Sequence, residues 1–128
     1  MRAFAVGPDS AFASRIADAA FAYMIPNFQN PSGRCYSTAE RDAVAAVCDR
    51  SGTPLFEDDP YRDLAYDPCD TSPIAGRLER ASWIYQGSFS KSFAPGLRLG
   101  YLVSSRDLQP YLVRLKQEIG RAPCRATV

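Results

Sequence analysis

Histidine is absent from this 128-residue chain, and lysine occurs only twice. The absence of histidine excludes a Ser-His-Asp triad, a histidine general base and a Cys/His zinc site. The four cysteines are widely spaced and form no C-x-x-C pair. We therefore interpret them as structural thiols, with Cys48 in the core, and expect no disulfide framework. Glycine loops of the G-x-x-x-x-G-K-[ST] or G-x-G-x-x-G type, which hold nucleotides, are also missing.

The chain also lacks a strong charge of either sign and any long hydrophobic run. Its formal net charge is +1 and its pI is about 7.6. Acidic and basic residues are mixed, so we expect neither a nucleic-acid nor a membrane partner. The apolar stretch at the N-terminus is too short for a signal peptide, which favours a cytoplasmic protein. A length of 128 residues allows one domain at most, and a hydrophobic content of 46% is sufficient for its core.

The scarcity of lysine draws attention to Lys91. The chain has thirteen arginines against two lysines, so arginine serves wherever a fixed cation suffices. A lysine amine can lose its proton and act as a nucleophile, whereas guanidinium cannot. Lys91 lies in a segment rich in glycine and serine, residues 87–100, which separates two apolar runs. Residue type alone also allows an ordinary solvated loop lysine.

Hydrophobic periodicity and turn signals alternate along the chain and predict an α/β fold. The capping-box sequence from Ser37 to Glu40 predicts the start of a helix that ends near Gly52. Asp107 is expected to cap a final amphipathic helix. The other expected elements are a weak helix over 10–19, strands over 21–25, 54–58, 83–86 and 99–104, and a short helix over 74–80. These elements predict part of a mostly parallel sheet flanked by helices.

Polar clusters follow three successive predicted strands. They span residues 30–33, 57–61 and 88–91, and Arg98 follows the third. Because parallel strands place their C-terminal ends at one edge of a sheet, we expect these clusters to converge. Together they supply an amide, carboxylates, a phenol, an amine, hydroxyls and a guanidinium. That set matches the needs of pyridoxal 5'-phosphate, which takes an anion at its ring nitrogen and a lysine at its aldehyde.

The same three clusters resemble the motifs of one enzyme family. Residues 26–33 read PNFQNPSG, residues 57–61 read EDDPY, and residues 87–100 read GSFSKSFAPGLRLG. In this order and spacing they resemble the fold-type-I, pyridoxal-phosphate-dependent class I/II aminotransferases, most of all the α-aminoadipate and broad-specificity branch. The resemblance runs from about residue 11 to residue 119. It implies a partial large, cofactor-binding domain, with an N-terminal segment (1–10) of uncertain structure and an irregular tail (120–128).

The resemblance also implies roles for individual residues. Lys91 corresponds to the catalytic lysine, which forms the Schiff base with the cofactor and then moves a proton. Asp58 corresponds to the partner of the ring nitrogen, because the family spacing D-x-x-Y ends at Tyr61. The remaining expected cofactor-binding residues are Asn30 and Tyr61 at the phenolate oxygen, and Ser88, Ser90 and Arg98 at the phosphate. No metal site is expected.

The family further implies transamination between an amino acid and a 2-oxo acid by a homodimer. A whole subunit is well over twice this length, so we expect a fragment that is inactive alone. The alternatives are a non-catalytic remnant or the ligand-sensing, aminotransferase-like domain of a transcription regulator. In such regulators the Asn-Pro pair and the Asp-Pro-Tyr segment are typically missing, and both are present here. A β-lactamase-like S-x-x-K at residues 88–91 lacks the accompanying S-D-N and K-T-G.

Overall fold

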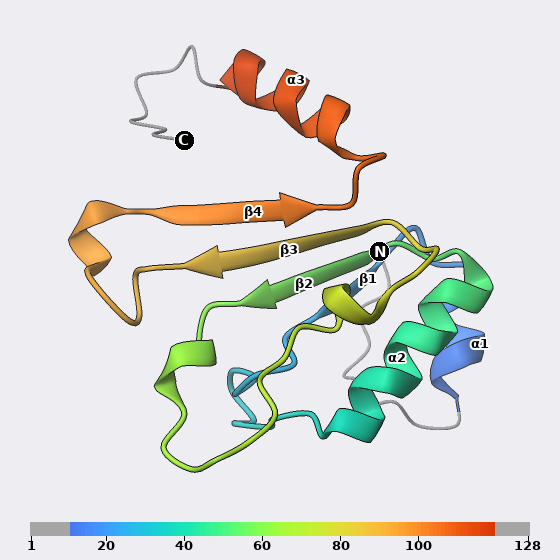
Figure 1. Ribbon diagram of the computed structural model, residues 1–128, viewed down its shortest axis with the longest axis horizontal. Helices are drawn as coiled ribbons and strands as arrows, with labels where there is room; N and C mark the ends of the chain where they lie inside the picture. Colours follow the sequence, from blue (N-terminus) through green and yellow to red (C-terminus); the bar gives the residue numbers. More distant parts are fainter. Residues whose placement is uncertain (1–10, 120–128) are drawn as a thin grey trace.

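Four strands form one sheet in the order β1-β2-β3-β4 (Figure 1). The structure is a computed structural model that describes residues 11–119. The helices and strands are α1 (Phe12–Ile16), β1 (Ala22–Met24), α2 (Thr38–Ser51), β2 (Leu55–Asp59), β3 (Trp83–Ser88), β4 (Gly100–Ser104) and α3 (Gln109–Ile119). The 3₁₀ helices are η1 (Arg62–Leu64), η2 (Ala75–Arg77) and η3 (Pro95–Leu97). The predicted α/β class is confirmed.

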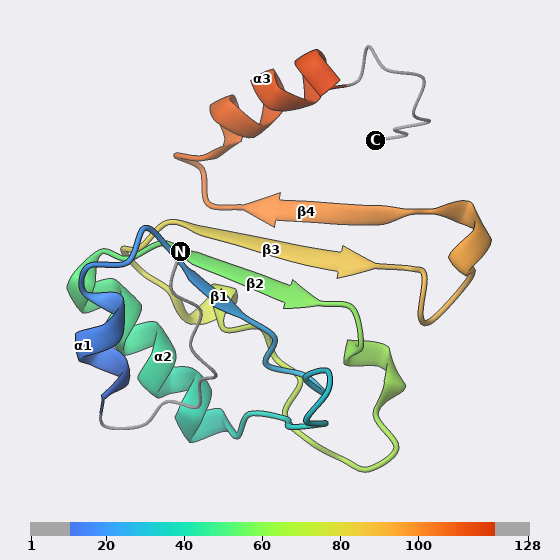
Figure 2. The same ribbon diagram turned by 180° about the vertical axis from the view of Figure 1, so that it is seen from behind.

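Strand direction decides where the polar clusters lie. β1, β2 and β3 are parallel, with Tyr23 opposite Phe56 and Glu57 opposite Tyr85. β4 is antiparallel to β3, since the connection between them is a loop without a crossover helix. The loops after β1, β2 and β3 consequently leave the sheet at the same edge, on the left in Figure 1 and on the right in Figure 2.

The hydrophobic core lies between one face of the sheet and the helices α1 and α2 (Figure 2). Side chains alternate between the faces of a strand, so Ala22 and Met24 of β1 enter the core while Tyr23 points to the other face. The largest apolar contributions from the helices and β2 come from Phe12, Ile16, Val44 and Leu55. Cys48 is fully buried among them, as predicted.

Helix α2 begins and ends at the predicted signals. The Ser37 hydroxyl accepts a hydrogen bond from Glu40 N, and the Glu40 carboxylate accepts one from Ser37 N. Gly52 ends the helix in the left-handed conformation with φ of +70°. The helix forms the crossover between the parallel strands β1 and β2.

Several observed boundaries differ from the predicted ones, and three of the differences have a clear structural cause. The expected helix over 74–80 is only the short turn η2, because the Asp49 carboxylate accepts hydrogen bonds from the backbone of residues 79–81 and holds them outside the helix. β3 extends to Ser88 because β4 pairs with its last residues. α3 begins at Gln109, so Asp107 is not its cap; the Asp107 carboxylate instead accepts a hydrogen bond from Ser82 Oγ at 2.5 Å.

On the β4 side of the described chain, apolar side chains of β4 and α3 are exposed to solvent. Leu102 and Val103 of β4 are each about half exposed, and α3 buries none of its residues. The predicted apolar face of α3 is thus uncovered, with Leu115 at 50% and Ile119 at 66% exposure. None of the described helices is long and apolar enough to cross a membrane. The predicted segments 1–10 and 120–128, including Cys124, lie outside the described residues.

Removal of the α2 cap should weaken the fold measurably. Ser37→Ala deletes the hydroxyl that accepts from Glu40 N, and the free energy of unfolding should fall by about 1 kcal/mol. Ser37→Thr keeps a capping hydroxyl and should retain most of that stability. Urea unfolding followed by circular dichroism measures both variants; an equal loss in both would contradict the capping assignment.

Candidate functional site

Two of the three predicted polar clusters are in direct contact at the loop edge of the sheet. Asn30 lies in the loop after β1, and Tyr61 directly precedes η1 after β2. Asn30 Nδ2 donates a hydrogen bond to the Tyr61 hydroxyl at 3.4 Å. Asn30 is exposed and Tyr61 is half-buried, so both polar groups remain open to a ligand at this edge.

The alternation of β2 separates its three consecutive acids. Glu57 and Asp59 point into the core and are 0% and 4% exposed, while Asp58 points to the opposite face. On that face Asp58 accepts hydrogen bonds from the Tyr23 hydroxyl at 2.5 Å and from Gln86 Nε2 at 3.3 Å. The strand therefore leaves a single carboxylate of the three accessible, flanked by donors from β1 and β3.

Both carboxylate oxygens of Asp59 accept hydrogen bonds from side chains inside the protein. Asn27 Nδ2 donates to both of its carboxylate oxygens, at 2.8 and 2.9 Å, and the Tyr85 hydroxyl donates at 2.8 Å. Burial raises the pKa of Asp59, and these two donors partly offset that rise. A carboxylate with these partners has no accessible oxygen for a ligand.

Glu57 joins β2 to the segment before β3. Its carboxylate accepts hydrogen bonds from Ile74 N at 3.1 Å and Ala75 N at 2.8 Å. Burial raises the pKa of Glu57 to about 7, although the two backbone donors act in the opposite direction. Glu57 therefore holds the backbone at the start of η2, and its buried carboxylate is not accessible to a ligand.

Tyr23 and Gln86 are the residues near Asp58 that sequence reasoning missed. Burial, followed by the hydrogen bond to Asp58, raises the pKa of Tyr23 to about 12, so its hydroxyl stays a donor at neutral pH. Both residues could have been found from strand alternation, because each occupies the same face as Asp58 in a neighbouring strand.

The loop after β3 carries Lys91 and is closed by its own backbone. Phe93 N and Ala94 N both donate to Phe89 O at 3.0 Å, and Ser88 Oγ accepts from Ser90 N at 3.2 Å. Ser88 and Ser90 are half-buried, so their hydroxyls lie at the surface of this loop. The turn thus fixes the backbone on both sides of Lys91.

Lys91 and Arg98 are the two cationic side chains of this loop. Both side chains are exposed, and neither has a hydrogen bond or ion pair within residues 11–119. Arg98 has a φ of +52°, an unusual conformation for a residue with a side chain. The structure does not place either cation in contact with Asp58, Tyr61 or Asn30. What the fold supplies is an amine and a guanidinium at the edge where the other two clusters lie.

Gly87 allows a close approach of backbone and ring at the start of this loop. A Cβ atom at this position would lie 2.2 Å from Cζ of Tyr101, across the pairing of β3 with β4. The Tyr101 ring also contacts Phe89, with centroids 5.5 Å apart. A side chain at residue 87 would displace the Tyr101 ring.

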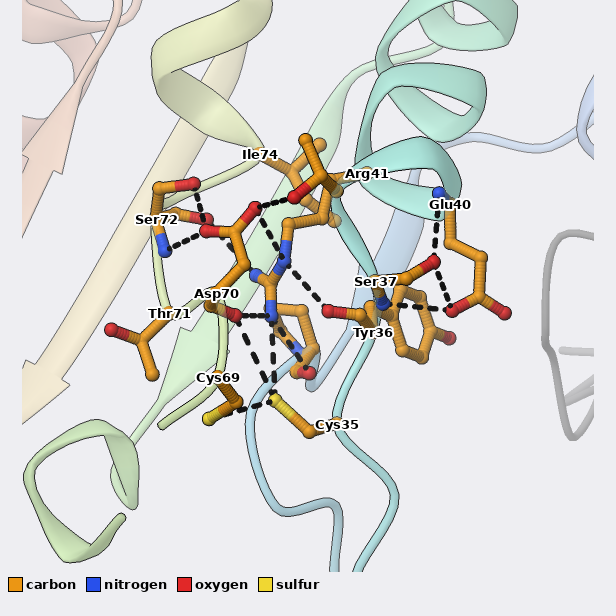
Figure 3. Close-up of polar contacts among 12 residues, drawn as sticks. Cys35, Tyr36, Ser37, Glu40, Arg41, Cys69, Asp70, Thr71, Ser72 and Ile74 are labelled. Carbon is orange, nitrogen blue, oxygen red and sulfur yellow. Dashed lines mark hydrogen bonds and ion pairs between the residues drawn. The ribbon is translucent and has the colours of Figure 1, made fainter. Parts of the chain in front are cut away.

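A buried arginine holds the loops behind this edge (Figure 3). Arg41 of α2 is 0% exposed, and its guanidinium donates to the carbonyl oxygens of Tyr36 at 3.0 Å, Ser72 at 2.9 Å and Asp70 at 2.6 Å. It also donates to Asn27 Oδ1 at 2.7 Å, and through Asn27 it orients Asp59. Sequence reasoning missed Arg41, because nothing distinguishes it there from a surface arginine of an amphipathic helix.

The accessible groups fit pyridoxal phosphate by their chemistry. Asp58 is a carboxylate for a protonated ring nitrogen, and Tyr61 and Asn30 are donors for a phenolate oxygen. Lys91 and Arg98 are unpaired within the described residues and match an aldehyde and a phosphate. All of these groups are exposed or half-buried, whereas the neighbouring acids Glu57 and Asp59 are buried.

Comparison with known proteins decides the family. A family model described as aminotransferase class I and II matches residues 16–120. The chain belongs to this family. An aromatic-amino-acid aminotransferase of Thermococcus litoralis is 34% identical over 99 residues, which are 77% of this chain and 22% of that protein. An HTH-type transcriptional regulator of Bacillus subtilis is 31% identical over 96 residues, 75% of this chain and 20% of the regulator.

A solved structure agrees with the sequence relatives. The α-aminoadipate aminotransferase of Thermus thermophilus, crystallised with N-(5'-phosphopyridoxyl)-L-leucine, superposes with a TM-score of 0.69 at 32% identity. The match covers 77% of this chain and 26% of that structure. The chain therefore spans about a quarter or less of the relatives described here. Membership in this class I/II family implies pyridoxal phosphate as its cofactor, as predicted.

The titration of Glu57 should appear in the pH dependence of stability. Its pKa of about 7 in the folded chain exceeds the ordinary value of 4.5, so the folded chain keeps a proton that the unfolded chain releases. The free energy of unfolding should therefore fall between about pH 4.5 and pH 7, by up to about 3 kcal/mol. Glu57→Gln should flatten this decline in urea unfolding measured at several pH values, whereas Glu79→Gln, at an exposed position, should not. A Glu57→Gln curve parallel to that of the parent chain would contradict the assignment.

Loss of the Arg41 guanidinium should strongly destabilise the fold. Arg41→Met removes the guanidinium that donates to oxygen atoms of Pro26, Asn27, Tyr36, Asp70 and Ser72. The free energy of unfolding should fall by about 3–5 kcal/mol. Arg50→Met alters an exposed arginine of the same helix and should change stability by less than about 0.5 kcal/mol. Chemical unfolding of the two variants tests this difference. Similar losses of stability in both would contradict the role of Arg41 in holding the loops.

Proposed function

We propose that this chain forms the core of the cofactor site of a pyridoxal-phosphate-dependent aminotransferase, and that it lacks activity alone. The observation that carries the proposal is the separation of the acids on β2. It leaves Asp58 accessible between Tyr23 and Gln86, and the loops that follow β1 and β2 bring Asn30 and Tyr61 into contact. The bound cofactor would act as an electron sink for the substrate carbanion.

The chain's own residues would bind and orient that cofactor. Asp58 would hold the proton of the ring nitrogen, and Tyr61 and Asn30 would donate to the phenolate oxygen. Arg98, with Ser88 and Ser90, would bind the phosphate through charge-assisted hydrogen bonds. The Lys91 amine would bind the cofactor aldehyde and, once released, carry a proton to and from the substrate α-carbon.

The proposed reaction transfers an amino group between an amino acid and a 2-oxo acid. The relatives that carry aminotransferase names support this choice, and the chain covers 22% of one of them. The remaining contacts with the substrate would come from parts of a complete subunit that this chain does not contain, within a homodimer.

A second candidate is a ligand-sensing domain of a transcription regulator. It is favoured by the HTH-type regulators among the relatives, whose identity to this chain is 31–36%, similar to that of the aminotransferases. Such a domain would use the same cofactor contacts without releasing products. Amino-group transfer by the full-length parent protein, assayed with a panel of amino acids and a 2-oxo acid, separates the two functions: turnover supports the enzyme, and cofactor binding without turnover supports the sensor.

The two lysines provide a matched test of the site. The chain is incubated with pyridoxal phosphate, reduced with borohydride and digested, and the modified residue is identified by mass spectrometry. We expect the adduct on Lys91 and, before reduction, the absorbance of a Schiff base near the short-wavelength limit of the visible range. Lys91→Ala should lose most of both signals, whereas Lys116→Ala, at an exposed position of α3, should keep them.

Two results would contradict the proposal. Equal labelling of Lys91 and Lys116 would mean that the aldehyde reacts with any exposed amine. Measurable transamination by the isolated chain would disprove its inactivity while leaving the cofactor site intact.

A further inference from the structure

Two thiols lie side by side at the buried Arg41 cluster (Figure 3). Cys35 Sγ is 3.7 Å from Cys69 Sγ, and both cysteines are free. Cys35 is half-buried in the loop after β1, and Cys69 is exposed in the segment between η1 and η2. The two residues are 34 positions apart in sequence, and their spacing suggested no pairing.

We propose that Cys35 and Cys69 are an oxidation site, at which a peroxide converts the two thiols into a disulfide. The disulfide requires the sulfur atoms to approach from 3.7 Å to about 2.05 Å, a change within reach of side-chain rotation. The proposal is independent of the cofactor site, since no part of it involves pyridoxal phosphate.

The backbone on both sides of the pair is already held in place. Arg41 donates to the carbonyl oxygens of Tyr36 and Asp70, the residues that directly follow the two cysteines. One rigid, buried guanidinium therefore fixes both segments relative to each other. Such preorganisation lowers the conformational cost of bringing the sulfur atoms together.

The contacts of the two sulfur atoms assign them different roles. Arg41 Nη2 donates to Cys35 Sγ at 3.6 Å, which places a cation beside that sulfur. The pKa of the Cys69 thiol is raised, through loss of hydration and the neighbouring Cys35 thiol. The Arg41 cation stabilises the negative charge that the Cys35 sulfur carries when it acts as a nucleophile. In the proposed order, Cys35 therefore attacks first and Cys69 resolves the intermediate.

The chemistry is balanced with hydrogen peroxide as the oxidant. The Cys35 sulfur attacks one peroxide oxygen, the O–O bond breaks, and the departing hydroxide takes the thiol proton and leaves as water. The Cys69 sulfur then attacks the resulting sulfenic acid, the S–O bond breaks, and a second water leaves with the Cys69 proton. Two thiols are oxidised, and the peroxide takes up the two electrons.

The link would tie together the loops that carry Asn30 and Tyr61. It would enclose α2, β2 and η1 within one covalent loop. Because a cross-link restricts the unfolded chain, the oxidised protein should unfold at a temperature about 5–10 °C higher than the reduced protein.

Peptide mapping can identify the link directly. The experiment uses the full 128-residue chain with Cys124→Ser, treated with hydrogen peroxide and digested with trypsin without reduction. Cleavage after arginine places Cys35, Cys48 and Cys69 in three separate peptides, residues 35–41, 42–50 and 63–77. We expect a reducible link between 35–41 and 63–77, formed within a monomer, while the buried Cys48 stays unmodified.

Two variants test the order of attack. Cys69→Ser should leave a sulfenic acid on Cys35 that a dimedone probe captures. Cys35→Ser removes the attacking thiol and should label weakly at Cys69. Equal labelling in the two variants would overturn the assignment of Cys35 as the attacking thiol.

Three results would overturn the oxidation site itself. The first is an absence of the link under conditions where the Cys69→Ser variant is labelled. The second is a link that forms only between two molecules. The third is formation at the same rate in a denaturant, because the folded chain should form the link several-fold faster if the native geometry brings the thiols together.

Discussion

The desolvation of two carboxylates on β2 is the constraint that organises this structure. Glu57 and Asp59 enter the core because they alternate with Phe56 and Asp58 along the strand. A buried carboxylate is costly unless hydrogen-bond donors compensate for the lost water. Glu57 obtains its donors from the backbone at the start of η2, and Asp59 obtains them from Asn27 and Tyr85.

These requirements extend outward through a chain of contacts. Asn27 can donate to Asp59 because its own carbonyl oxygen is held by Arg41. Arg41 in turn reaches the backbone of the loops on both sides, at Tyr36 and Asp70. The loop that carries Asn30 and the segment that follows Tyr61 are therefore positioned from the inside of the protein. The accessible site on the outside and the thiol pair behind it share this support.

The open face of the sheet has the opposite character. Asp58 accepts hydrogen bonds from Tyr23 and Gln86 of the two neighbouring strands, and the side chains of Lys91 and Arg98 have no partner within the described residues. Two kinds of polar group thus occur within a few residues of each other. The buried groups are satisfied by protein and hold the fold, and the accessible groups are available to a ligand.

The sequence by itself determined the fold class, the family and the order of the three polar clusters. Their signals are local: a capping box at Ser37, turn residues after each strand, and a lysine among arginines. The family and the choice of Asp58 came from the resemblance of three motifs to those of the aminotransferases, including the spacing D-x-x-Y that ends at Tyr61. None of these inferences requires contacts between distant residues, because hydrogen bonds within a turn and side-chain alternation within a strand depend only on near neighbours.

Only the tertiary structure decided which polar residues support the site from within. Arg41 looks like any helical arginine in the sequence, and it becomes buried because the loop before α2 and the segment 70–72 close over it. Cys35 and Cys69 likewise became neighbours through the packing of those loops, although their spacing suggested isolated thiols. The direction of β4 and the short turn η2 followed from strand pairing and from the carboxylates of Asp49 and Glu57. Long-range contacts of this kind depend on how loops are brought together in space, and that information is absent from periodicity and local motifs.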